Sequence, residues 1–301
     1  MNAPSVTPSR GWERVVSHLD RGTILVLGAP GSGKTTLARW MLGQLDRGLD
    51  RVAVVDCDPG ASAIGVPGCL GMALTGPWQA PAAMWFVGDV TPPGRLLPAV
   101  IGAARLAERA RQRGAQAVIV DASGVVEGAT ARALHYHLAL ASGVDQVVAL
   151  ERQGELEPLL SLLSGAGRRI DRLSVSSAAR PRREEELQSR REARFAAHLV
   201  GAKTRLFSPR RLLGRDWTAG TDGGGAGTEA TLAEGTVVGL LDGEGFCLGL
   251  GLVEEVHPDR VAVLTRVGDV PVVRLQVGDF RLDPEGREIG RAVGVAAGTS
   301  G

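Results

Sequence analysis

One short segment of the chain has residue types and a spacing that suit the binding of phosphate groups. Gly28-Ala-Pro-Gly-Ser-Gly-Lys-Thr35 matches the pattern G-x-x-x-x-G-K-[ST]; it follows a strand-like run at 24–27 and opens a helix-like run. Its glycines let backbone N–H groups approach phosphate oxygens, and the following helix N-terminus adds partial positive charge. The predicted cofactor-binding residues are Gly28, Ala29, Pro30, Gly31, Ser32, Gly33, Lys34, Thr35 and Thr36.

Two side chains of this segment have distinct chemical roles. Lys34 is one of only two lysines, with Lys203, among 34 basic residues, so an ammonium group stands where the planar guanidinium of arginine would not fit. Lys34 is predicted to reach the β- and γ-phosphates, and the Thr35 hydroxyl to bind Mg²⁺. The loop by itself predicts a nucleotide-binding protein and does not specify a reaction.

Three aspartates follow strand-like runs and could hold a metal ion or accept a proton. Asp56 and Asp58 follow the run 52–55, and Asp121 ends the run 118–120. Ligands of open α/β sheets bind at the carboxyl ends of strands, so these side chains are expected beside the phosphate site. Carboxylates there can bind Mg²⁺ or accept the proton of an attacking hydroxyl group. The residues alone leave the division of roles open, because Asp-Pro-Gly is also common in turns and Asp121 could cap a loop.

The chain alternates strand-like and helix-like runs over its first two thirds. Strands are predicted at 23–27, 52–55, 85–87, 117–120 and 146–150, and helices at 35–45, 95–113, 130–141 and 155–163. This order predicts an α/β fold of the P-loop NTPase type, with a parallel sheet and helices on both faces. Further strand-like runs at 236–241, 246–256, 260–265, 270–277 and 280–282 predict a small C-terminal all-β domain.

Composition divides the chain into segments. We expect a disordered tail at 1–9, a P-loop domain at 10–217, a glycine-rich linker at 218–233, the β domain at 234–291 and a second disordered tail at 292–301. Residues 168–215 hold fourteen basic and five acidic residues, although the net charge of the whole chain is only +1. This concentration suits a clamp on phosphates, or a solvated helix with pairs such as Glu186 and Arg190.

The remaining composition excludes several classes of protein. The three cysteines form no CxxC pair, so neither a disulfide framework nor a zinc site is predicted. No apolar run reaches the length of a signal peptide or of a bilayer span, which predicts a cytoplasmic protein without a membrane partner.

The ordered set of motifs resembles the polynucleotide 5′-hydroxyl kinases of the pre-mRNA cleavage-complex and pre-rRNA-processing type, most closely their archaeal single-protein forms. The resemblance covers roughly residues 20 to 290. Besides the P-loop it rests on Asp56-Cys-Asp-Pro-Gly-Ala-Ser62, Val66-Pro-Gly68, Phe86-Val-Gly88, Asp121-Ala-Ser-Gly124, the run 148–158, Arg191-Glu-Ala-Arg-Phe195, Gly239-Leu-Leu-Asp242 and Gly249-Leu-Gly251.

The resemblance implies transfer of the γ-phosphate of ATP to the 5′-hydroxyl end of RNA, DNA or both, with ATP and Mg²⁺ as cofactors. It implies that Asp56 engages the acceptor hydroxyl, with Asp58 as the second candidate for this role. The implied metal ligands are Thr35, Asp58 and Asp121; the implied acceptor clasp is Ala122, Ser123 and Gly124; and Arg182 and Arg191 of an arginine-rich lid at about 180–202 would close on the phosphates.

The chain departs from the family pattern at a few positions. Ala61 stands where glutamine is usual, Ala122 and Val125 replace the threonine and tryptophan of the clasp, and Leu187 lies near an expected lid arginine. Two alternatives therefore stay open: a non-catalytic ATP-binding scaffold of an RNA-processing complex, and a nucleotide-gated switch or metallochaperone. Against the second, the chain has no N-K-x-D or T-K-x-D motif and no cluster of Cys and His. Protein partners are not predicted.

Overall fold

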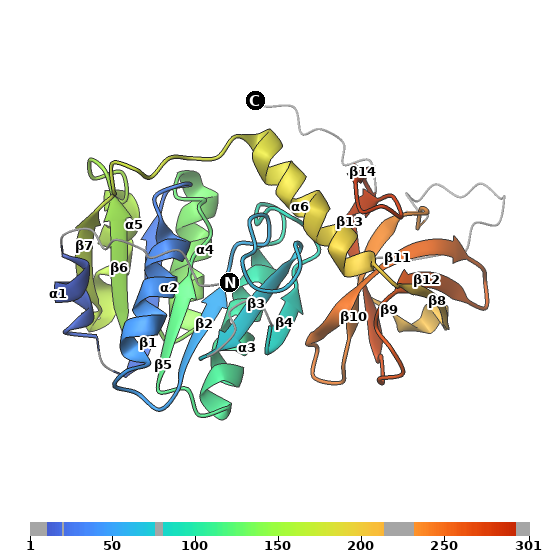
Figure 1. The fold of residues 1–301 in the computed structure, drawn as a ribbon, viewed down its shortest axis with the longest axis horizontal. Coiled ribbons are helices and arrows are strands. Elements are labelled where there is room, and N and C mark those ends of the chain that lie inside the picture. Colours follow the sequence, from blue (N-terminus) through green and yellow to red (C-terminus); the bar gives the residue numbers. More distant parts are fainter. Residues whose placement is uncertain (1–10, 20, 76–80, 214–231, 293–301) are drawn as a thin grey trace.

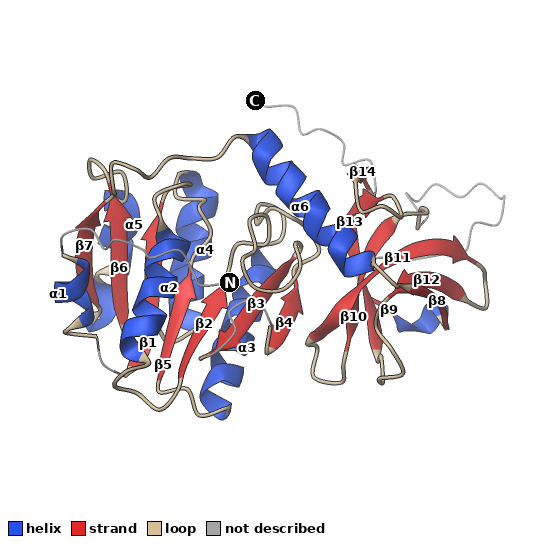
Figure 2. Cartoon of the chain, in the orientation of Figure 1, coloured by secondary structure: helices blue, strands red, loops and turns tan. Residues whose placement is uncertain are grey.

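A computed structural model describes residues 11–19, 21–75, 81–213 and 232–292. Two sheets form the molecule, with a long helix between them (Figures 1 and 2). The predicted tail at 1–9, residues 293–301 of the predicted tail at 292–301, and residues 218–231 of the predicted linker lie outside the described residues.

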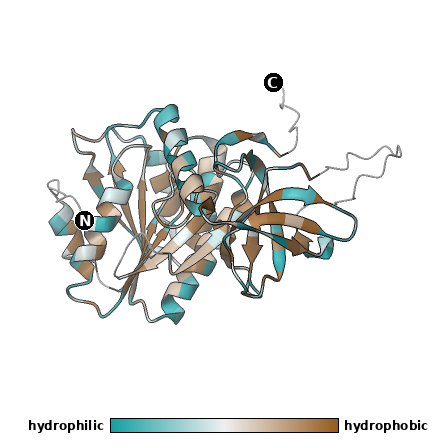
Figure 3. Ribbon diagram, turned by 45° about the vertical axis from the view of Figure 1, so that its right-hand side comes forward, coloured by the Kyte–Doolittle hydropathy of each residue, from teal (hydrophilic) through white to brown (hydrophobic). Residues whose placement is uncertain are grey.

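The first sheet has seven strands in the order β4-β3-β2-β5-β1-β6-β7. Strands β2, β5, β1, β6 and β7 run parallel, while β3 and β4 form an antiparallel edge. The bounds are β1 Gly22–Gly28, β2 Val52–Asp56, β3 Cys69–Leu74, β4 Ala83–Phe86, β5 Ala117–Asp121, β6 Gln146–Glu151 and β7 Arg169–Ser174. The central strands are apolar because helices cover them on both faces (Figure 3).

Alternation along β1 explains how the two faces are filled. Leu25 and Leu27 belong to a core with the helices at 96–112, 128–141 and 157–163, whereas Ile24 and Val26 belong to a core with the helices at 12–16 and 34–45. The helices are α1 Trp12–Val16, α2 Lys34–Leu45, α3 Leu96–Gln112, α4 Gly128–Ala141 and α5 Glu157–Leu163, followed by the 3₁₀ turn Gly165–Gly167. The predicted α/β class, with helices on both faces of the sheet, is therefore confirmed.

The second sheet is antiparallel apart from one short parallel pairing, β9 with β13. Its order is β14-β13-β10-β11-β12-β8. The bounds are α6 Glu184–Leu199, β8 Lys203–Phe207, the 3₁₀ turn Pro209–Arg211, β9 Leu212–Leu213, β10 Thr236–Leu241, β11 Cys247–Val256, β12 Val261–Thr265, β13 Arg274–Leu282 and β14 Glu288–Arg291. The predicted C-terminal all-β unit is present, and its two runs at 270–277 and 280–282 are one strand, β13.

Two strands of this sheet come from before the predicted linker. β8 pairs with β12 and β9 pairs with β13, although residues 10–217 were assigned to the P-loop domain. Alternation within a five-residue strand does not reveal which sheet the strand joins, because partner choice depends on residues some 60 positions away. We propose that the second domain begins near Lys203.

The two domains share a hydrophobic core. Phe86 of β4 and Phe195 of α6 pack with Phe280 of β13 in one buried cluster. A Cβ atom on Gly239 would lie 2.5 Å from the Phe86 ring, so glycine permits this close approach. Ion pairs between Arg95 and Asp279, Arg109 and Glu244, and Asp89 and Arg291 add polar contacts around the core. No helix within the described ranges has both the length and the apolar character needed to span a membrane.

Candidate nucleotide and acceptor site

The phosphate loop connects β1 to α2. Gly28 ends β1 and Lys34 begins α2, and between them Gly31 and Gly33 adopt φ values of 69° and 98°, in the left-handed region that favours glycine. A Cβ atom on Gly31 would collide with the backbone of Pro181, so the segment leading to α6 passes directly over the loop. The first N–H groups of α2 have no partner within the helix and are available to an anion.

Lys34 folds back over the loop in this structure. Its Nζ donates to the carbonyl oxygens of Gly28, at 2.8 Å, and Ala29, at 3.2 Å, and the side chain is buried. Burial lowers the pKa of Lys34, and the nearby carboxylates of Asp121 and Asp58 oppose that shift. Beside it, the buried Ser32 Oγ has no hydrogen-bond partner in the described residues. Both groups suit the binding of phosphate oxygens. Of the other predicted loop residues, Pro30 and Thr36 are exposed.

Thr35 and Asp121 meet beside the loop. The Thr35 hydroxyl donates to Asp121 Oδ2 at 2.6 Å, and Asp121 Oδ1 is buried without a partner among the described residues. Burial raises the pKa of Asp121 to about 6, although Lys34 and Thr35 act in the opposite direction. A hydroxyl group next to a carboxylate with an unpaired oxygen is a donor set that Mg²⁺ accepts, with water completing its shell. Within the described ranges, no cluster of three Asp, Glu, His or Cys side chains forms a closed metal cage.

Asp56 and Asp58 have different surroundings. Asp56, paired in register with Asp121, is 2% exposed, and its Oδ1 accepts from the Asp58 N–H at 3.1 Å. Its Oδ2 accepts from the backbone N–H groups of Ala63 and Ile64. Burial, reinforced by Asp121 and Asp58, raises the pKa of Asp56 to about 8. Asp56 therefore anchors the loop that follows β2.

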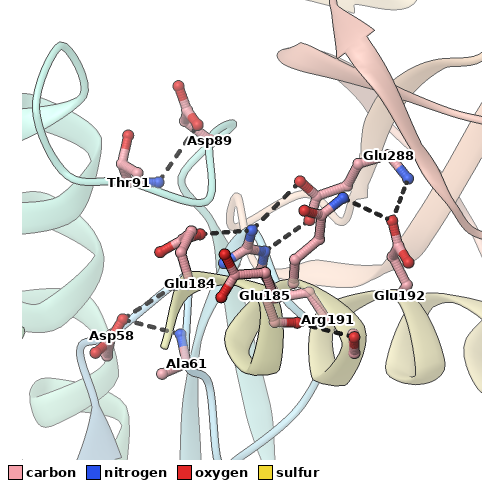
Figure 4. A network of polar contacts seen from close by, with 12 residues as sticks. Asp58, Ala61, Asp89, Thr91, Glu184, Glu185, Arg191, Glu192 and Glu288 are labelled. Carbon is pink, nitrogen blue, oxygen red and sulfur yellow. Dashed lines mark hydrogen bonds and ion pairs between the residues drawn. The ribbon is translucent and has the colours of Figure 1, made fainter. Parts of the chain in front are cut away.

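Asp58 is the more accessible of the two carboxylates. It is half-buried, and its Oδ1 accepts from the N–H groups of Gly60 and Ala61 at 3.1 and 3.0 Å (Figure 4). Within the described part of the chain its Oδ2 accepts no hydrogen bond. Because its charge acts on Lys34, Asp58 lies close to the phosphate loop with one oxygen available.

The predicted clasp packs against the same loop. Ala122 and Ser123 are buried, and the Val125 N–H donates to Ser123 Oγ at 3.3 Å. A Cβ atom on Gly124 would lie 3.2 Å from Pro30, so the turn after β5 touches the phosphate loop. The structure thus brings the residues predicted for the clasp next to those predicted for phosphate binding.

The two arginines predicted for the lid differ in exposure and in what they contact. Arg182 is exposed and follows Pro181, which covers Gly31. Arg191 is 9% exposed; its guanidinium pairs with Glu288 of β14 at 2.6 Å and with Glu184 at 3.1 Å (Figure 4). In this conformation Arg191 joins α6 to the second sheet and does not point to the phosphate loop.

Two residues of the site were not anticipated. Arg194 on α6 donates to the carbonyl oxygens of Ser62 and Gly65, in the loop that Asp56 anchors from within. His135 on α4 lies 2.7 Å from the Val125 carbonyl oxygen. Arg194 is part of the basic segment and of the motif Arg191-Glu-Ala-Arg-Phe195, but neither pattern indicates that it contacts the loop of residues 62–65. The helical run of α4 holds His135 and His137, and the sequence does not show which of them makes a buried contact.

The family assignment follows from a family model. The model described as "mRNA cleavage and polyadenylation factor CLP1 P-loop" matches residues 28–200, more than half of the chain. The chain belongs to this family. The resemblance noted from the motifs is therefore confirmed, and the matched region spans the phosphate loop, the three aspartates, the clasp and α6.

Curated relatives cover nearly the whole length of this family member. The polyribonucleotide 5′-hydroxyl-kinase of Pyrococcus furiosus is 26% identical, with 92% of each chain covered. The enzyme of the same name from Methanocaldococcus jannaschii is 24% identical, with 89% of each chain covered. The solved Clp1p–Pcf11p complex includes a chain with a similar fold, at a TM-score of 0.65 and 15% identity, covering 90% of this chain and 77% of that one. This last likeness concerns the fold alone.

Proposed function

We propose that the protein is an ATP-dependent polynucleotide 5′-hydroxyl kinase, which transfers the γ-phosphate of ATP to the 5′-hydroxyl end of RNA, and of DNA where the clasp accepts it. One observation carries the proposal. Asp121, which is bonded to Thr35 of α2, ends β5, and Asp58, with an available oxygen, follows the neighbouring strand β2; both act on Lys34. A phosphate-binding end and a group that can engage a hydroxyl therefore lie side by side, in a chain whose curated relatives are named as 5′-hydroxyl kinases.

Different residues of the site bind the phosphates, the metal ion and the acceptor. The backbone N–H groups of residues 31–35 and the Lys34 side chain hold the phosphates, and Lys34 turns from the loop carbonyl oxygens to the β- and γ-phosphates when the nucleotide binds. Thr35 and Asp121 would hold Mg²⁺, and the bound ion would neutralise charge on the phosphate oxygens. Asp58, predicted as a third ligand, has one available oxygen, which we assign to the acceptor. Asp58 Oδ2 accepts a hydrogen bond from the acceptor 5′-hydroxyl and orients it for in-line attack.

Asp56 contributes through the loop that it anchors. Its two oxygens hold the N–H groups of residues 58, 63 and 64, and they thereby fix where Asp58 stands. Ser123 and Gly124 form the opposite wall, against Pro30. We propose that the acceptor end enters between these two loops.

Arginines on the segment above the loop complete the site. Arg182, next to the residue that covers Gly31, would contact the transferred phosphoryl group as its charge develops. Arg191 would reach the phosphates only after its pairs with Glu184 and Glu288 part. Arg194 holds the loop of residues 62–65 and is proposed to position it.

Phosphate transfer from γ-³²P-ATP to matched 5′-hydroxyl RNA and DNA oligomers tests the proposal. Lys34→Ala is expected to reduce the rate by about 10²-fold or more, the usual loss for a preorganised group that stabilises transition-state charge. Lys203, the only other lysine, is exposed on β8, and Lys203→Ala serves as the matched control. Label transfer at the wild-type rate by Lys34→Ala would contradict the proposal. Tight ATP binding without transfer to any end would favour the scaffold, and a strong preference for GTP would favour the switch.

A further inference from the structure

His135 occupies an unusual position for a polar side chain. It lies on α4 with an exposure of 0%, and its Nε2 is 2.7 Å from the carbonyl oxygen of Val125. Burial lowers the pKa of His135 to about 4, so the ring is neutral at pH 7 and carries a single proton. Because a carbonyl oxygen can only accept, that proton is on Nε2. Nδ1 is buried and has no hydrogen-bond partner among the described residues.

The turn after β5 is held firmly on one side. Asp121 is paired in register with Val26 and with Asp56, and its carboxylate accepts from Thr35. The N–H of Ala122 then donates to the Val26 carbonyl oxygen at 3.1 Å. These contacts fix the part of the turn that faces the nucleotide, and none of them involves α4.

The other side of the turn depends on α4. Ser123 Oγ accepts from the Val125 N–H, and the Val125 carbonyl oxygen accepts from His135. A continuous chain of hydrogen bonds therefore leads from α4 to Ser123, next to Gly124, which packs on Pro30. An apolar side chain of similar size would fill the same space but would leave the Val125 carbonyl oxygen without this donor.

We propose that His135 is a positioning residue for the acceptor: through the Val125 carbonyl it fixes the Ser123–Gly124 turn, and it thereby sets the affinity for the 5′-hydroxyl substrate and not the affinity for ATP. The inference rests on the proposed kinase function. The effect is limited to the acceptor because different contacts hold the two sides of the turn. Loss of the His135 contact releases residues 123–125, while strand pairing still holds Asp121 at the nucleotide.

Steady-state kinetics of three variants test this role, with a 5′-hydroxyl oligoribonucleotide and ATP varied in turn. His135→Leu is expected to raise the KM for the oligonucleotide about tenfold, the size of one lost hydrogen bond of ordinary strength, and to change the KM for ATP less than about twofold. His135→Gln places an amide N–H near the position of Nε2 and is expected to restore the wild-type KM. His137→Leu, at an exposed position on the same helix, is the control and is expected to match wild type.

Thermal unfolding of each variant separates positioning from folding. If His135→Leu does not fold, His135→Gln and His135→Asn decide the question, since the shorter asparagine does not reach the Val125 carbonyl and must raise the acceptor KM while glutamine does not. Equal changes in both KM values, a change in kcat alone, or failure of glutamine to restore the acceptor KM would overturn the inference. If wild type transfers phosphate to no 5′-hydroxyl end, the kinase proposal itself fails. Binding of a fluorescent oligonucleotide, measured by anisotropy, then tests His135 separately: weaker binding to His135→Leu alone supports the role, and equal binding overturns it.

Discussion

Replacing Asp121 by asparagine should make the nucleotide-free protein more stable at pH 8. Asp121 is 2% exposed; one oxygen accepts from Thr35 and the other is buried without a partner in the described residues. Asparagine has the same shape, and its amide oxygen can still accept from Thr35. The substitution exchanges one unpaired buried atom for another and removes a carboxylate whose ionised form is disfavoured by burial.

The pKa of Asp121 sets the size and the sign of the effect. It is about 6 in the folded protein against an ordinary value of 3.8, and at 1.36 kcal/mol per unit this difference is about 3 kcal/mol. Between these two values the folded state binds more protons than the unfolded state, so the free energy of unfolding falls as the pH rises from about 4 to 6. Asparagine has no proton to lose. Asp121→Asn is therefore expected to gain about 3 kcal/mol at pH 8 and only about 1 kcal/mol at pH 4.5.

Urea denaturation at both pH values, without nucleotide or Mg²⁺, measures these differences. The same variant is expected to lose phosphate transfer by about 10²-fold or more, because the carboxylate proposed to hold Mg²⁺ becomes a neutral amide. Asp89→Asn is the contrasting control: Asp89 is 1% exposed but paired with Arg291, so its replacement should destabilise the protein. A loss of stability in Asp121→Asn at pH 8, or the same gain at both pH values, would refute the reasoning.

Four further substitutions test the roles assigned to the site and to the segment above it. Asp58→Asn should lower kcat for transfer to 5′-hydroxyl ends by about 10²-fold with little change in urea stability, and an unchanged rate would exclude Asp58 as the group that engages the acceptor. Arg191→Gln and Glu288→Gln should each destabilise the fold by about 2 kcal/mol and show coupling above about 1 kcal/mol in a double-mutant cycle. A fall in kcat for Arg191→Gln at full stability would instead place its guanidinium on the phosphates. Gly31→Ala should weaken ATP binding at least about tenfold by calorimetry, since a φ of 69° is strained for alanine and its Cβ would strike Pro181; wild-type affinity would show that this segment moves freely.

Local patterns in the sequence were sufficient to identify the phosphate loop and the core of the first domain. A P-loop is a contiguous stretch whose glycines and lysine act where they stand, and buried parallel strands are continuous apolar runs, so both are visible in short windows. The placement of Asp56, Asp58 and Asp121 at one edge also followed from sequence order, because parallel strands end on the same side. Two strands of the first sheet were not predicted: β3, although its residues Cys69–Leu74 are apolar and mostly buried, and the edge strand β7, Arg169–Ser174, in which only Leu173 is buried.

Tertiary structure decided which of these side chains are available for chemistry. Asp56 and Asp58 are two residues apart and identical in type, yet one has both oxygens bonded to its own loop and the other has an oxygen available. Arg191 finds Glu288 almost a hundred residues later in the chain, and His135 finds a carbonyl ten residues earlier. Such pairings depend on where distant segments meet after folding, and no spacing in the sequence encodes them.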